Sequence, residues 1–214
     1  SLDEHALLRQ GPAAVTHLFE VSAGLDSLII GETEILGQVK SAYETALANG
    51  STGKSLNVLF QRALHVGKKV RSETGIAVGQ TSVASVAVQL AESIFGGLCE
   101  RRVLVLGAGA MAELTARHLL GKKVAQLTIS NRTFEKAAVL AEKLEAGALP
   151  SKDFPEPLGL ADIVIASTGS QRPVVTREMV AAALKARAGR SLFMIDIAMP
   201  RDVEDSVHEL DQAY

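Results

Sequence analysis

A glycine-rich turn near the middle of the sequence has the residues and spacing of a dinucleotide site. Residues 103 to 113 read VLVLGAGAMAE, in which Gly107, Gly109 and Ala112 take the three positions of a GxGxxA turn. The turn follows an expected strand and opens an expected helix, which is the context that dinucleotide binding requires. Gly107 allows the tight turn, Gly109 lets the backbone approach a pyrophosphate at the helix N-terminus, and Ala112 keeps the helix close to the strand. The cofactor-binding residues expected in this turn are Gly107, Ala108, Gly109, Ala110, Met111 and Ala112. The alternative is a turn used only for packing.

The residues after the second expected strand bear on which dinucleotide binds. NAD sites place an acid about 20 residues after the glycines, where it bonds the ribose 2′-hydroxyl. Here the strand ends in Ser130, Asn131, Arg132 and Thr133, without an acid. Arg132 offers a cation and a planar fork for a phosphate, and its three neighbours offer neutral hydrogen-bond partners. This favours NADPH, although Arg132 as a solvated side chain and Thr133 as a helix cap are the plain alternatives.

Two later turns follow expected strands at the same edge of the sheet, where ligands of such folds bind. We expect Ser167, Thr168 and Gly169 to offer backbone amides and a hydroxyl to the cofactor. Residues 196 to 201, DIAMPR, could flank the nicotinamide. Purely structural roles stay open for both turns, with Asp196 as a cap.

A second set of polar residues lies in a mostly apolar stretch, residues 17 to 38, HLFEVSAGLDSLIIGETEILGQ. The stretch carries no cation, and the first one after it is Lys40. Spacing alone favours ordinary roles: a satisfied helix histidine at His17, a solvated helix start at Glu32 and Glu34, and a surface amide at Gln38.

The elements that must position these groups change in character near residue 100. Before it, apolar residues recur at three- and four-residue steps through 18–25, 35–46 and 56–64, and an Ala/Val-rich helix at 82–95 ends at a glycine pair. After it, buried strands are expected at 103–106, 127–130, 163–166 and 192–195, with a weaker one near 148–149, and helices at 110–120, 133–145 and 176–188. This alternation predicts an α/β fold, a Rossmann-type doubly wound parallel sheet preceded by a mainly helical part of a catalytic domain. We expect domains at 1–97 and 98–214.

Composition excludes several classes. The 214 residues include 22 Lys and Arg against 24 Asp and Glu, too balanced for a non-specific nucleic-acid binder. Cys99 is the single cysteine, so a disulfide framework is excluded, and neither a signal peptide nor an apolar run of about 18 residues is present. We therefore expect a cytoplasmic protein without a membrane partner. Three histidines, His5, His118 and His208, lack partners at ligand spacing, so no metal site is expected.

The combination of segments resembles one family. HLFEVSAGLDSLIIGETEILGQVKSAYETA, then GAGAMAE, SNRT, ASTGS and DIAMPRDV, in this order, is similar to glutamyl-tRNA reductase, the NADPH-dependent enzyme that begins tetrapyrrole (porphyrin and heme) synthesis from glutamate. The resemblance implies that Ser27, Glu32, Thr33, Glu34 and Gln38 bind the glutamate moiety, whose ammonium group needs acceptors. It also implies that His17 is important for activity, beside the reacting carbonyl.

The family's mechanism implies further partners. A thiolate attacks the aminoacyl ester of glutamyl-tRNA(Glu), and NADPH reduces the thioester to glutamate-1-semialdehyde. Cys99 fails as that nucleophile, because it precedes the amino end of the first strand, and it is expected to be a small buried hydrophobe. The resemblance implies that the nucleophile and a dimerisation domain lie outside this chain, which would bind NADPH without turnover. It also implies a homodimer and contact with glutamate-1-semialdehyde aminotransferase.

One cationic helix face could meet the tRNA. Arg62, His65 and Lys69 share a face at i, i+3 and i+7, flanked by Lys68 and Arg71. A solvated face is the commoner explanation of such a pattern. Two other functions stay open for the whole chain: a shikimate-dehydrogenase-like oxidoreductase, which predicts a mixed α/β segment before residue 97, and a non-catalytic nucleotide-binding interaction module.

Overall fold

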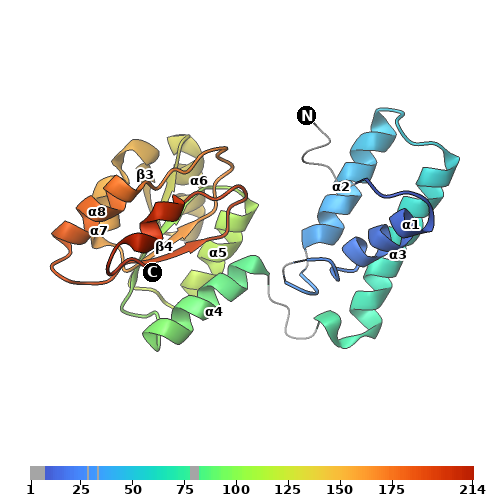
Figure 1. Ribbon diagram of the computed structural model, residues 1–214. Coiled ribbons are helices and arrows are strands. Elements are labelled where there is room, and N and C mark those ends of the chain that lie inside the picture. The colour runs from blue at the N-terminus through green and yellow to red at the C-terminus, as the bar shows by residue number, and fades with distance from the viewer. Residues whose placement is uncertain (1–7, 28, 33, 78–81) are drawn as a thin grey trace. The chain divides into compact units, whose positions relative to one another are not determined.

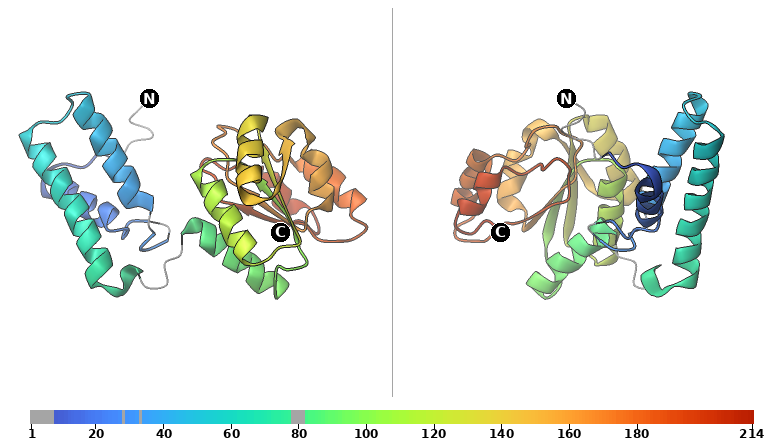
Figure 2. Two further views of the ribbon diagram at one scale, coloured as in Figure 1. Left: turned by 180° about the vertical axis from the view of Figure 1, so that it is seen from behind. Right: turned by 45° about the vertical axis from the view of Figure 1, so that its right-hand side comes forward.

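In the computed structural model the chain divides into two compact units, Ser1–Val83 and Ala84–Tyr214 (Figures 1 and 2). The structure describes residues 8–27, 29–32, 34–77 and 82–214. No helix among these residues is both long and apolar enough to cross a membrane.

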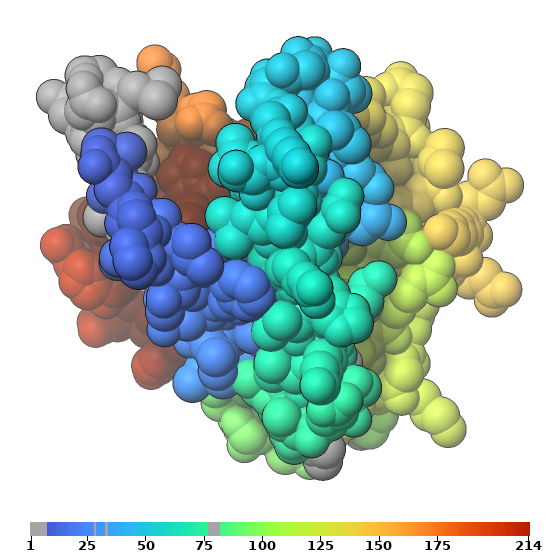
Figure 3. Space-filling view, turned by 90° about the vertical axis from the view of Figure 1, so that its right-hand side faces the viewer, coloured from blue at the N-terminus to red at the C-terminus, as the bar shows by residue number. Residues whose placement is uncertain are grey.

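The first unit is helical over its described residues. It consists of α1 (Gly11–Ser22), α2 (Glu34–Ala48), α3 (Lys54–Glu73) and a short 3-10 turn, η2 (Gly75–Ala77). Tyr43 of α2 stacks on Phe60 of α3, with ring centroids 5.3 Å apart. Gly67 lets α3 approach the end of α1, because a Cβ there would lie 2.4 Å from the carbonyl oxygen of Ser22. Figure 3 shows this unit from the side on which α3 runs in teal.

The second unit is built on a parallel sheet. Its strands are β1 (Arg102–Leu106), β2 (Gln126–Asn131), β3 (Gly147–Pro150), β4 (Ile163–Ala166) and β5 (Phe193–Asp196). The pairings are all parallel, and the spatial order is β3-β2-β1-β4-β5. The order reverses at β1, so a ligand crevice is expected outside the carboxyl ends of β1 and β4.

Helices cover both faces of the sheet (Figures 1 and 2), as a parallel sheet requires. They are α4 (Val83–Phe95), α5 (Ala110–Gly121), α6 (Phe134–Leu144), α7 (Pro155–Leu160) and α8 (Arg177–Ala186), with 3-10 turns η3 (Ser151–Asp153) and η4 (Asp205–Glu209). Val103 and Val105 of β1 pack in one core with α4, α5 and α6, whereas Leu104 and Leu106 pack in the other with α7 and α8. Burial on two faces explains the unbroken apolar runs of the strands.

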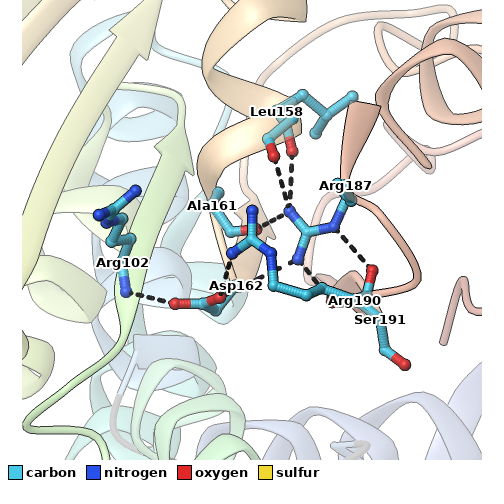
Figure 4. A network of polar contacts seen from close by, with 8 residues as sticks. Arg102, Leu158, Ala161, Asp162, Arg187, Arg190 and Ser191 are labelled. Atoms are coloured by element: carbon cyan, nitrogen blue, oxygen red, sulfur yellow. Dashed lines mark hydrogen bonds and ion pairs between the residues drawn. The ribbon is translucent and has the colours of Figure 1, made fainter. Parts of the chain in front are cut away.

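A buried arginine links chain segments by hydrogen bonds at the amino end of the sheet (Figure 4). Arg187 is 1 % exposed, and its guanidinium donates to the carbonyl oxygens of Ala161, Gly159 at 3.2 Å and Ser191 at 2.5 Å. Burial lowers the pKa of Arg187 below its ordinary value. Asp162 completes the network, because its carboxylate lies 4.0 Å from Arg187 and accepts the backbone N–H of Arg102 at 3.0 Å. The start of β1, the loop before β4 and the end of α8 are thereby joined.

The predicted α/β fold with a Rossmann-type parallel sheet is confirmed, and the strand at 147–150 is present. Helix α7 was not predicted, because PEPLGL is only six residues long and carries two prolines and a glycine. The buried side chains of α4, Val88 and Ala91, lie in the core of the second unit, so the division falls at the start of this helix, whereas the sequence placed the boundary near residue 97.

The expectation that Cys99 is buried was wrong. Its side chain is exposed, in the turn between α4 and β1. The preceding residue, Leu98, takes the buried position instead and packs in the core with Val88 and Val103.

Candidate functional site

The glycine turn joins three strands at the carboxyl end of the sheet. Gly107 follows β1 with φ +118°, and a Cβ there would lie 2.2 Å from the carbonyl oxygen of Ser167, which follows β4. The Gly107 N–H donates to the carbonyl oxygen of Ser130 at 2.7 Å, and the Ser167 N–H donates to that of Leu106 at 2.8 Å. The fold itself therefore requires glycine at this position.

Gly109 differs from Gly107 in what surrounds it. It is the N-cap of α5, with φ −86°, and, its chain neighbours aside, no heavy atom of a described residue lies within 4 Å of the position that a Cβ would take. Neither the backbone conformation nor the packing of the protein requires a glycine here. The space before the first turn of α5 is open, where helical N–H groups lack intrahelical partners and favour anions.

The rest of the turn forms the start of α5. Ala110 and Met111 are in its first turn, and Ala108 packs partly buried against the core. Ala112 is 0 % exposed and lies in the core with β1 and β2 residues. A larger side chain at Ala112 would push α5 from the sheet, which is the role that the sequence predicted for this position.

A cavity of about 400 Å³ lies beside this turn, at the carboxyl ends of β1, β2 and β4. The predicted cofactor residues that line it are Ser130, Asn131, Arg132, Thr168 and Gly169. The structure adds Leu106, Ser151, Lys152, Phe154, Ser170, Val174 and Met179, which the sequence analysis did not single out. Ser151 and Lys152 directly follow the weak strand β3, so a firmer prediction of that strand could have identified them.

Outside the glycine turn, two predicted cofactor residues, Thr133 and Ser167, do not line the cavity. The carbonyl of Ser167 faces Gly107, as described above. Thr133 is the N-cap of α6, without a side-chain cap bond, and its carbonyl oxygen accepts the Nδ2 amide of Asn131 at 2.9 Å. Thr133 and Asn131 therefore shape the turn that carries Arg132.

A buried hydroxyl without a partner lines the cavity. Ser130 is 1 % exposed, and its Oγ makes no hydrogen bond within the described protein. Leaving such a group unpaired costs about 1–3 kcal/mol, which a polar ligand can recover. Arg132 and Lys152 contribute exposed cations, and neither forms an ion pair with a described carboxylate. The donors of this cavity fit a ligand that bears hydroxyl and phosphate oxygens.

The loop after β4 is held by a buried aspartate. Asp202 is 0 % exposed; its carboxylate accepts the N–H of Thr168 at 2.6 Å and also the Thr168 hydroxyl. Burial raises the pKa of Asp202 above its ordinary value, while the bonds from Thr168 oppose that rise. Thr168 thus lines the cavity with its amide and hydroxyl already bound, contrary to the expectation that it offers them to a ligand.

Asp196 caps the turn that follows β5, which is the structural role that the sequence also allowed. Its carboxylate accepts the N–H groups of Ala198 at 3.0 Å, Asp202 at 2.8 Å and Val203 at 2.9 Å. These bonds fold residues 196 to 203 into a compact turn. Asp196 therefore positions Asp202, which in turn holds Thr168.

The polar stretch of the first unit forms a closed loop between α1 and α2. The N–H of Gly31 donates to the carbonyl oxygen of Gly24 at 2.8 Å. Gly31 is required, because its φ is +82° and a Cβ would lie 2.4 Å from the carbonyl oxygen of Ile76. His17 of α1 reaches this loop, and its Nδ1 lies 3.4 Å from a carboxylate oxygen of Asp26. Ser27, the next residue, is half-buried.

The acids of this stretch surround the start of α2. The Glu32 carboxylate accepts the N–H groups of Glu34 at 3.2 Å and Ile35 at 3.1 Å, which is a helix cap. The Glu32 carbonyl oxygen accepts from the guanidinium of Arg71 at 2.5 Å. Burial, and then the charge of Glu32, raise the pKa of Glu34 above its ordinary value.

The loop brings His17 and Asp26 into contact, and Ser27 is the residue after Asp26. Glu34 and the exposed Gln38 lie four residues apart on α2, and so share a helix face. Thr33 lies outside the described residues.

The cationic face of α3 is smaller than predicted. Arg62, His65, Lys68 and Lys69 are exposed. Lys69 forms an ion pair with Glu73 at 3.7 Å, and the guanidinium of Arg71 donates a hydrogen bond to the carbonyl oxygen of Glu32. Within the described ranges no group of three His, Cys, Asp or Glu residues is arranged to hold a metal ion.

Comparisons with known proteins match both units. Residues 1–74 match the family described as Glutamyl-tRNAGlu reductase, N-terminal domain, and residues 89–214 match Shikimate / quinate 5-dehydrogenase. The glutamyl-tRNA reductase of Syntrophus aciditrophicus is 49% identical over 204 residues, which are 95% of this chain and 48% of that protein. That of Bacillus pumilus is 45% identical over 205 residues, 96% of this chain and 45% of the relative.

A solved structure of the same family also matches the chain. Glutamyl-tRNA reductase from Methanopyrus kandleri matches with a TM-score of 0.60 and 40% sequence identity, covering 96% of this chain and 52% of that one. The chain thus spans about half the length of the relatives that it matches.

Proposed function

Because the chain belongs to the glutamyl-tRNA reductase family, with a second unit of the shikimate/quinate 5-dehydrogenase family, we propose that it binds NADPH for the reduction of glutamyl-tRNA(Glu) to glutamate-1-semialdehyde. This is the first step of tetrapyrrole biosynthesis by the C5 pathway. The observation that carries the cofactor assignment is the cavity of about 400 Å³ that holds the unpaired Ser130 hydroxyl next to the free cation of Arg132.

The cofactor would be held by two parts of the sheet edge. The open space before Gly109 and the first N–H groups of α5 suit the pyrophosphate. The cavity beyond β2 suits the adenosine end, where Ser130 would bond a ribose oxygen and Arg132 a 2′-phosphate. When bound, NADPH supplies the hydride. The described residues position it, and the loop of Thr168 and Gly169 is held rigid for it by Asp202.

The first unit would hold the glutamyl group. Its free ammonium needs anionic acceptors, which Glu34 and Glu32 can supply, and Ser27 and Gln38 can bond its oxygens. His17 would stand beside the reacting carbonyl. Asp26, at 3.4 Å from its Nδ1, would orient the ring so that Nε2 faces the substrate.

Formation of the thioester would need a cysteine other than Cys99. Cys99 is exposed in the turn before β1, at the amino end of a strand, whereas ligands of this fold bind at the carboxyl ends. We propose that the cysteine that forms the thioester is not among these 214 residues. The chain alone would bind NADPH and not turn over glutamyl-tRNA.

The helical first unit distinguishes this proposal from a shikimate-dehydrogenase-like oxidoreductase. That alternative predicts a mixed α/β segment before residue 97, and the described residues of the first unit form helices α1, α2 and α3. A non-catalytic nucleotide-binding module gives no reason for a His17–Asp26 pair beside Ser27. The homodimer and the aminotransferase contact stay predictions from the family. The cytoplasmic location stays a prediction from composition, and the tRNA contact through α3 stays a prediction from the spacing of its cations.

The cofactor assignment is tested by Arg132→Ala. We expect this variant to lower NADPH affinity at least about tenfold and to leave NADH affinity within about twofold, because only NADPH carries the 2′-phosphate. Arg132→Lys is the matched control, and it should give an intermediate loss, since it keeps the charge and lacks the planar fork. Isothermal titration calorimetry measures all four affinities. Equal losses for both cofactors would contradict a phosphate role.

The assignment of the nucleophile is tested by turnover. The chain, incubated with NADPH and glutamyl-tRNA(Glu), should form no glutamate-1-semialdehyde, while NADPH binding by the same preparation is retained. Semialdehyde formation that Cys99→Ser abolishes would show that Cys99 is the nucleophile after all.

A further inference from the structure

Two successive segments bring cations to one cavity. Arg132 follows β2, and Lys152 lies in η3 directly after β3; both line the cavity of about 400 Å³. The two strands are parallel neighbours, and their last paired residues are Asn131 and Pro150. The chain therefore leaves both strands at the same edge of the sheet, one residue before Arg132 and two residues before Lys152.

The position of Lys152 is fixed by its neighbours. Phe154, two residues later, is 5 % exposed and packs in the core with Leu158 and Val180. Ser151, one residue earlier, is half-buried and lines the cavity as well. The 3-10 turn is thus anchored on both sides of Lys152, whose side chain stays exposed.

The two cations lack protein partners. Neither Arg132 nor Lys152 forms an ion pair with a described carboxylate, although other exposed cations of this unit do: Lys143 pairs with Glu113 at 2.7 Å and Lys122 with Glu92 at 2.6 Å. Two like charges that line one cavity repel each other, and a multiply charged anion between them removes that repulsion. The apolar side chains of Val174 and Met179 line the same cavity and can contact a planar ring.

We propose that Lys152 is a second specificity-determining residue for the cofactor, which binds the 2′-phosphate of NADPH together with Arg132. This inference rests on the proposed function, since it assumes that the cavity takes the adenosine end of a dinucleotide. Arg132 supplies a directional fork and Lys152 a point charge, so the two contribute separately to affinity. The preference for NADPH over NADH then arises from the segments that follow both β2 and β3, and not from the residues after β2 alone.

The test uses Lys152→Met, which keeps most of the apolar stem and removes the charge. We expect this variant to bind NADPH and adenosine 2′,5′-bisphosphate about tenfold more weakly than the parent chain, with affinities for NADH and AMP changed less than about twofold. Lys152→Arg should retain at least half of the NADPH affinity. The matched control is Lys185→Met, an exposed lysine in the last turn of α8 that does not line the cavity, and it should leave all four affinities unchanged.

The outcomes separate this inference from the proposed function. Retained NADPH preference in Lys152→Met, or an equal loss of NADPH and NADH affinity, would overturn the role of Lys152 while dinucleotide binding stands. A parent chain that binds NADPH and NADH equally would overturn any 2′-phosphate site. A parent chain that binds neither cofactor would overturn the proposed function as well. Circular dichroism confirms that each variant is folded.

Discussion

At the scale of single residues, the two glycines of the turn do different work. Gly107 has a positive φ and lies against the Ser167 carbonyl, so its role is to let strands β1 and β4 meet. Gly109 has an ordinary φ and an open space beside it, so the fold does not explain it. The sequence motif assigns the tight turn to Gly107 and the close approach of the pyrophosphate to Gly109. The structure adds that packing against Ser167 requires the first glycine and that packing does not require the second.

This separation predicts opposite phenotypes for two alanine substitutions. Gly107→Ala should destabilise the second unit by about 2 kcal/mol or more, because the added Cβ meets backbone at 2.2 Å and the φ is strained. Gly109→Ala should change the free energy of unfolding by less than about 1 kcal/mol and weaken NADPH binding at least about tenfold. Urea denaturation and calorimetric titration measure the two effects. A stable Gly107→Ala protein would refute the packing role.

At the scale of elements, the loops at the carboxyl edge are tied to one another by acids. Asp196 at the end of β5 accepts the N–H of Asp202, and Asp202 accepts the N–H and hydroxyl of Thr168 after β4. The chain segment DIAMPRDV therefore holds the loop that lines the cavity. Its acids are explained by backbone N–H groups that need acceptors, before any contact with a ligand.

The burial of the Asp202 carboxylate makes stability depend on pH. Burial raises the pKa of Asp202 in the folded chain above its ordinary value of 3.8, so this group contributes most stability below pH 3.8, and that contribution is lost as pH rises toward the folded pKa. In Thr168→Val the hydroxyl that donates to the Asp202 carboxylate is lost. Because that bond favours the charged carboxylate, its loss raises the pKa of Asp202 further. We expect it to lower the free energy of unfolding by about 1–3 kcal/mol at pH 7 and by less at pH 4.

The control for this prediction is Thr168→Ser, which keeps the hydroxyl and should retain most of the stability at both pH values. Urea denaturation followed by circular dichroism gives the free energies. An effect of Thr168→Val that is the same at pH 4 and pH 7 would mean that the Asp202 carboxylate is not what the hydroxyl stabilises.

At the scale of the whole second unit, the two ends of the sheet have different tasks. The carboxyl end carries the cavity, the glycine turn and the loop of Thr168. The amino end is closed by Arg187, which bonds carbonyl oxygens of the α7 end and of the turn after α8, with Asp162 beside it. Stability and ligand binding should therefore be separable by substitution.

Arg187→Met tests that separation. It fills much of the same volume and leaves several buried carbonyl oxygens without a donor, so we expect a loss of about 3 kcal/mol in the free energy of unfolding. NADPH affinity of the folded fraction should change less than about twofold, because the network lies at the edge opposite the cavity. Arg190→Met is the matched control: its side chain is exposed and pairs with the same Asp162 at 3.6 Å, so its loss should stay below about 1 kcal/mol. An NADPH affinity that falls with Arg187→Met would contradict the separation.

Much of the fold could be predicted because its signals are local. The apolar runs of β1 and β4, buried on two faces, and the helical spacing of α2 and α3 follow from side-chain periodicity. Helix α7 was missed because a six-residue helix with two prolines has almost no periodicity, and its burial depends on α8. The exposure of Cys99 was missed because Leu98 and Cys99 are both apolar, and only packing decides which of them is buried.

The sequence by itself determined the parallel sheet, the glycine turn, the absence of an acid after β2 and the family, since each depends on residue order over short stretches. Only the tertiary structure decided that Thr168 is bound to Asp202, that Arg71 donates to the Glu32 carbonyl, and that Lys152 lines one cavity with Arg132. These contacts join residues from 20 to about 40 positions apart, and a chain's local preferences do not specify which of its distant groups will meet. Their partners are set by where the sheet places the ends of its strands.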